Sequence, residues 1–157
     1  MGYAIFCAGL IREVDAKLLE LLASLRPEEW DLQTVAPEWK VRDVAGTHSD
    51  EDLVTLVNRL NREGVAFYGK LSPAILISLM AVACGELAEF HEALNPFALA
   101  AFAVSWAAED KSLNWFDTAR ELTERWHHQQ QIRLATGRPG IMTRALYRPV
   151  LDCFMRG

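Results

Sequence analysis

The sequence predicts an all-α fold, a four-helix bundle with an additional short C-terminal helix. Apolar residues recur at three- and four-residue steps through several long segments, which is the spacing of a helix with one buried face. Capping and helix-stopping residues bound these segments. No periodic strand pattern competes with them. Because each such helix must bury its apolar face against another, a bundle is the most economical architecture.

The first helix is predicted over residues 10–26, where leucines and valines recur on one face. Pro27 stops it. A connector bounded by Pro27 and Pro37 follows. The segment 41–47 then has the length of barely two helical turns, which is short for a bundle helix.

A second long helix is predicted over residues 49–68. Ser49 stands three residues before Asp52, which approximates a capping box. The third helix is predicted over residues 72–94. Its start is marked by a serine cap, Ser72, followed by proline at the first helical position.

Residues 97–112 alternate apolar residues at their centre and are predicted as either a short extended segment or a loop over the bundle. The fourth helix is predicted over residues 114–136, with Gly137 as its C-terminal stop. A short fifth helix over residues 143–155 closes the chain.

Composition predicts one globular domain over residues 1–157, with 51% hydrophobic and 24% charged residues. A net charge of −5 disfavours nucleic acid and anionic membrane as main partners, because both attract clustered Lys and Arg. Three scattered cysteines among apolar residues, Cys7, Cys84 and Cys153, are typical of buried thiols in a reducing cytosol. The apolar run in the third helix is interrupted by Glu86, so we expect a bundle helix, no membrane partner and a cytoplasmic protein.

Glu124 and His128 stand four residues apart in the fourth helix and would lie one turn above the other, where they can share a divalent metal. Any charged helical face produces such pairs. A helical wheel places both residues opposite the apolar stripe of Trp115, Leu122 and Trp126, which predicts a solvated face unless another element covers it.

Two blocks of sequence resemble a known family. The stretch "LLELLASLRPEEWDLQTVAPEWKVRDVAG" is followed far downstream by "NWFDTARELTERWHHQQQIRLATGRP". Together they resemble the DinB superfamily, specifically the group of mycothiol-dependent maleylpyruvate isomerase N-terminal domains. The resemblance covers most of the chain.

The resemblance implies a four-helix bundle that binds a divalent metal, often zinc or nickel. The ligands in that family are a first His on helix two and a Glu or His plus a His on a later helix, where Glu124 and His128 match. Some members use the metal to activate a low-molecular-weight thiol such as mycothiol. We expect Arg133 or Arg138 to bind the carboxylate of a small-molecule substrate or of a thiol conjugate, although helix-end arginines usually face solvent.

The family pattern places its first histidine ligand at the position that Thr47 occupies in this chain. The histidine of this chain, His48, stands one residue later. One step turns a helical side chain by about 100°. His48 is therefore either a displaced third ligand or part of the cap of the next helix. Either the protein has a deletion near residues 46–48, or the sequence joins two segments across a missing one that holds the histidine. We favour the second explanation.

Two functions remain open. One is a metal- and thiol-dependent isomerase or transferase. The other is a non-catalytic bundle that binds a small ligand or forms a homodimer through Ile5, Phe6 and Leu10 of the first helix, which would then be exposed. Of the other histidines, His127 is predicted to be packed and His91 to be exposed near a helix end.

Overall fold

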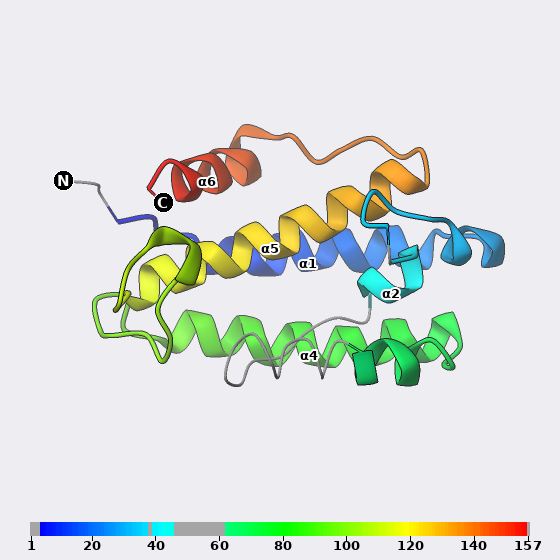
Figure 1. Ribbon diagram of the computed structural model, residues 1–157, viewed down its shortest axis with the longest axis horizontal. Coiled ribbons are helices and arrows are strands. Elements are labelled where there is room, and N and C mark those ends of the chain that lie inside the picture. The colour runs from blue at the N-terminus through cyan, green and yellow to red at the C-terminus, as the bar shows by residue number, and fades with distance from the viewer. Residues whose placement is uncertain (1–3, 38, 46–61, 157) are drawn as a thin grey trace. The chain divides into compact units, whose positions relative to one another are not determined.

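The structure is a computed structural model that describes residues 4–37, 39–45 and 62–156. Within these ranges the regular secondary structure is helical. The β pairing there consists of two isolated bridges, Gln33 with Lys40 and Leu99 with Leu113. The predicted all-α class is confirmed (Figure 1).

The helices lie close to their predicted positions. They are α1 (Ala8–Ala23), the 3-10 helix η1 (Pro27–Asp31), α2 (Val41–Ala45), a helical segment at residues 62–68, α4 (Pro73–Ala93), the 3-10 helix η2 (Ser105–Ala107), α5 (Asn114–Ala135) and α6 (Arg144–Phe154). The predicted start of the second long helix, at Ser49 and Asp52, lies outside the described residues. The segment 97–112 is a loop that contains η2 and the bridge at Leu99.

The helix ends follow the local sequence signals. The hydroxyl of Ser72 accepts the backbone N–H of Ile75 at 3.4 Å before α4. At the end of α5, Gly137 adopts a φ of +64°, the N–H of Arg138 donates to the carbonyl of Arg133 at 2.8 Å, and the N–H of Gly137 donates to Leu134 at 3.2 Å. This is a Schellman motif, in which a left-handed glycine closes the helix.

The chain divides into two compact units. The first comprises Met1–Leu18, Val82–His127 and Ile141–Gly157, and the second comprises Leu19–Ala81 and His128–Gly140. The long helices contribute one part to each unit.

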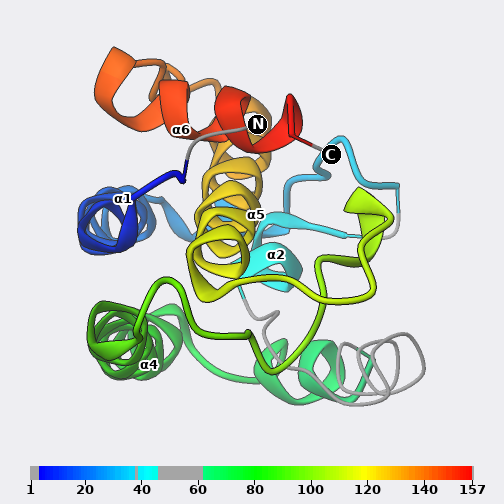
Figure 2. The ribbon, with the colours of Figure 1, turned by 90° about the vertical axis from the view of Figure 1, so that its left-hand side faces the viewer.

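The core of the first unit joins α1, α5 and α6 (Figure 2). Its fully buried side chains include Ile11, Phe116 and Leu146. Ile5 also belongs to this core at 8% exposure, so the expectation that it is an exposed dimer contact was wrong. It precedes α1 in an extended segment, where alternate side chains point to opposite sides: Phe6 is 68% exposed and touches the ring of Phe97.

The buried side chains of the second unit come from several short segments as well as from the long helices. Trp30 of η1 and Val41 of α2 are almost completely buried, as is Ile132 of α5. Trp30 and Val41 thus supply apolar area from elements too short to be stable alone.

Almost all residues of α5 are buried or half-buried. Within this fully described helix, Leu134 is the one exposed residue, and Arg125 and Gln129 are among the buried ones. The predicted solvated face of Glu124 and His128 was wrong, because both side chains are half-buried. The buried polar side chains Arg125 and Gln129 of α5 form hydrogen bonds with other side chains.

α4 has one buried stripe and an exposed apolar face. Leu76 and Met80 are buried on the stripe, whereas Ile75, Leu79 and Val82 are about half exposed or more. By length and composition this 21-residue helix is apolar enough to cross a membrane, despite the expectation from Glu86, because its most apolar 18-residue window has a mean hydropathy of 1.6. That is weak evidence, since the core helix of a soluble protein passes the same test.

Candidate metal site and its surroundings

Glu124 and His128 lie one turn apart on α5, as predicted, and both are half-buried. Nδ1 of His128 is 3.1 Å from Oε1 of Gln131, three residues further along the helix. A histidine that ligates a metal usually has its other ring nitrogen hydrogen-bonded in this way. The arrangement of His128 therefore fits a ligand role.

The ring of Trp39 lies against His128 in the second unit. The ring centroids are 5.9 Å apart with an interplanar angle of 45°. The carbonyl of Trp39 accepts hydrogen bonds from the backbone N–H of Thr34 at 3.1 Å and from the side-chain amide of Gln33 at 2.8 Å. These bonds fix the loop before α2, so the tryptophan of the first sequence block meets the histidine of the second.

The start of α2 explains another residue of the first block. Oδ2 of Asp43 accepts the backbone N–H of Lys40 at 2.8 Å, so the carboxylate caps the helix from its third position. An acidic side chain there also favours the positive end of the helix dipole. The aspartate of the block thus has a structural role in α2.

The third expected ligand, His48, lies outside the described residues, as do Thr47 and the junction at residues 46–48. Among the residues that the structure does describe, no group of three or more His, Cys, Asp or Glu side chains is placed to hold a metal ion. Glu124 and His128 are two donors of a suitable kind.

Arg133, the expected cofactor-binding residue, makes internal contacts. Its Nε donates to Oε1 of Gln129 at 3.0 Å and its Nη1 donates to the carbonyl of Pro139 at 3.0 Å. Burial and the neighbouring Arg138 lower its pKa from the ordinary value. These contacts hold the guanidinium at the C-terminal end of α5, and binding of a carboxylate by Arg133 stays a prediction.

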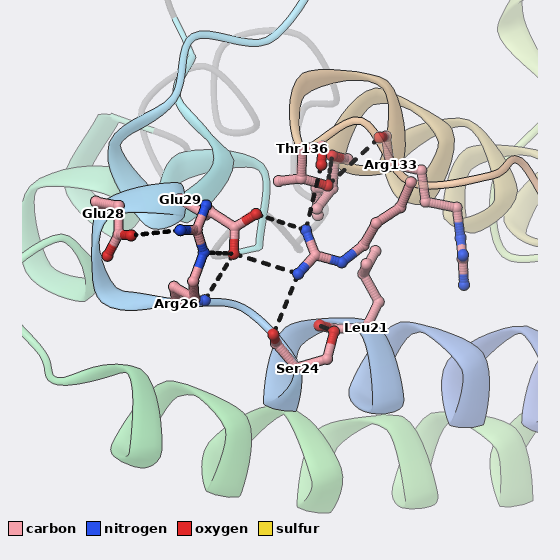
Figure 3. A network of polar contacts seen from close by, with 9 residues as sticks. Leu21, Ser24, Arg26, Glu28, Glu29, Arg133 and Thr136 are labelled. Carbon is pink, nitrogen blue, oxygen red and sulfur yellow. Dashed lines mark hydrogen bonds and ion pairs between the residues drawn. The ribbon is translucent and has the colours of Figure 1, made fainter.

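Arg138 binds a carboxylate, but that carboxylate is the side chain of Glu29. Nη1 of Arg138 donates to Oε1 at 2.8 Å and Nη2 donates to Oε2 at 3.2 Å. Nη2 also donates to the carbonyl of Ser24, and the backbone N–H of Arg26 donates to Glu29 (Figure 3). Hydrogen bonds from Arg138 and Arg26 lower the pKa of Glu29 to about 2. The network ties the loop after α5 to the end of α1 and to η1.

The sequence did not predict a buried charge cluster in the first unit. Nη1 of Arg125 donates to Oδ1 of Asp15 on α1 at 2.5 Å, and its Nε donates to Oε1 of Glu121 at 2.8 Å. Burial alone would lower the pKa of Arg125, but the two carboxylates outweigh it and raise that pKa. Arg125 is therefore charged, and its partner on α1 is 110 residues away in sequence.

The neighbouring Cys84 belongs to the same cluster. Its sulfur is 3.6 Å from Nη1 of Arg125. Burial and the charge of Asp15 raise the pKa of this thiol. Cys7 and Cys153 are also buried, and burial raises the pKa of Cys7 to about 12, with a contribution from Cys153. The prediction of buried thiols is confirmed, and at neutral pH all three hold their protons.

The structure corrects the expectation for His91 and confirms the one for His127. His91 is 6% exposed, and its Nδ1 is 3.1 Å from the hydroxyl of Thr118 on α5. Burial lowers its pKa. His127 is half-buried, with Nδ1 3.2 Å from the carbonyl of Thr123 and its ring edge-on to Trp126. Neither histidine lies in the predicted site.

Comparison of the chain with protein-family models, with curated proteins and with solved structures found no match.

Proposed function

We propose that the protein is a DinB-like divalent-metal-binding protein, a metal- and thiol-dependent isomerase or transferase. The contact between Trp39 and His128 carries the proposal. It brings together, within the second unit, the two sequence blocks that resemble the family.

The donor chemistry supports zinc or nickel. A glutamate oxygen and an imidazole nitrogen are ligands that both metals accept. Glu124 and His128 would provide them, and the third would be a histidine of helix two, either His48 or one in the missing segment favoured above. Three protein ligands leave a position open for a small molecule, which is the arrangement of catalytic rather than structural sites.

Each residue near the proposed metal has a defined task. His128 would bind through Nε2 while Gln131 holds Nδ1. The indole of Trp39 packs against the imidazole. Arg133 would attract the carboxylate of mycothiol or of the substrate. When bound, the metal would lower the pKa of a coordinated thiol and so supply a nucleophile near neutral pH.

Thermal unfolding with added zinc or nickel tests the proposal. At a metal concentration about 100 times Kd, the wild-type melting temperature is expected to rise by about 5–10 °C. Glu124→Gln and His128→Gln are expected to lose most of this rise. The matched control is His127→Gln, which removes the adjacent imidazole and is expected to keep it. No rise in the wild type would contradict the proposal.

The exposed apolar side chains favour a second candidate, a non-catalytic bundle that self-associates. Phe6 and Phe97 touch each other and are both more than 60% exposed. Contiguous exposed apolar surface of this kind often marks an interaction site. Size-exclusion chromatography with light scattering would show a homodimer if this candidate is right. Glu124→Ala and His128→Ala would then leave stability and ligand binding unchanged.

A further inference from the structure

We draw no further inference here: the strongest candidate, the exposed apolar patch where Phe6 touches Phe97 in the first unit, already supports the self-association candidate above, and nothing in the described residues shows what covers it.

Discussion

Arg125 of α5 and Asp15 of α1 form a buried ion pair in the first unit, with side chains only 2% and 5% exposed. Glu121 supplies a second carboxylate to the same guanidinium at 2.8 Å. Two acids around one base, all shielded from water, couple the two helices electrostatically.

Removing one member of this cluster of charged side chains is expected to lower the free energy of unfolding strongly. Arg125→Met leaves buried carboxylates without their cation and should lower the free energy of unfolding by about 3 kcal/mol or more. The double variant Asp15→Leu with Arg125→Met should recover a large part of this loss. Urea unfolding followed by tryptophan fluorescence measures both. The exposed pair of Arg12 and Glu92, bonded at 2.7 Å, is the control, and its loss should matter much less.

Replacing glycine by alanine is expected to have opposite effects on stability at Gly137, at the end of α5, and at Gly85, within α4. Gly137→Ala places a side chain at a φ of +64° and should destabilise the protein by about 1 kcal/mol, even though its Cβ would meet no atom. Gly85→Ala lies within α4, also with open space around its Cβ, and should stabilise by about 0.5–1 kcal/mol. Urea midpoints that move in the same direction would contradict this account.

The ion pair between Glu29 and Arg138 predicts a loss of stability in acid. The pKa of Glu29 is lowered to about 2 in the folded chain, from an ordinary 4.5, so the stabilisation is present above pH 4.5 and is lost as the pH falls toward 2. Glu29→Gln should be less stable than the wild type at neutral pH, and the difference should shrink with acidification. Unfolding curves measured between these limits test this, and a constant difference would refute it.

His91 predicts a pH dependence in a separate, higher range. Burial lowers its pKa below the ordinary 6.5, with Glu121 and Asp117 acting against this effect and Arg125 and Arg120 acting with it. Below pH 6.5 the unfolded chain therefore binds a proton that the folded chain does not, and stability falls with the pH. His91→Gln should reduce this slope of unfolding free energy against pH. An unchanged slope in the variant would show that other groups cause it.

Much of the secondary structure could be predicted because its signals are local. Ser72 before α4, Pro73 at its first position and Gly137 after α5 each act within one helical turn, and the structure places the helix ends beside them. α6 begins at Arg144, one residue after the predicted start. These signals do not depend on the rest of the fold.

The environment of α5 could not be predicted because it depends on distant residues. A helical wheel assumes that charged residues face solvent, but Arg125 is buried against Asp15 from another helix. His91 is buried for the same kind of reason, since its partner Thr118 lies 27 residues away. The spacing of Glu124 and His128 was local and is found on α5, whereas the proximity of Trp39 to His128 depends on the fold.

Metal content per chain tests the proposed function most directly. Protein purified without a histidine tag is incubated with zinc, dialysed and analysed for metal by elemental analysis. About one zinc ion per chain is expected for the wild type and for His127→Gln, and much less for Glu124→Gln and His128→Gln. A wild-type protein that retains no zinc or nickel, or variants that retain as much as the wild type, would contradict the metal site at Glu124 and His128.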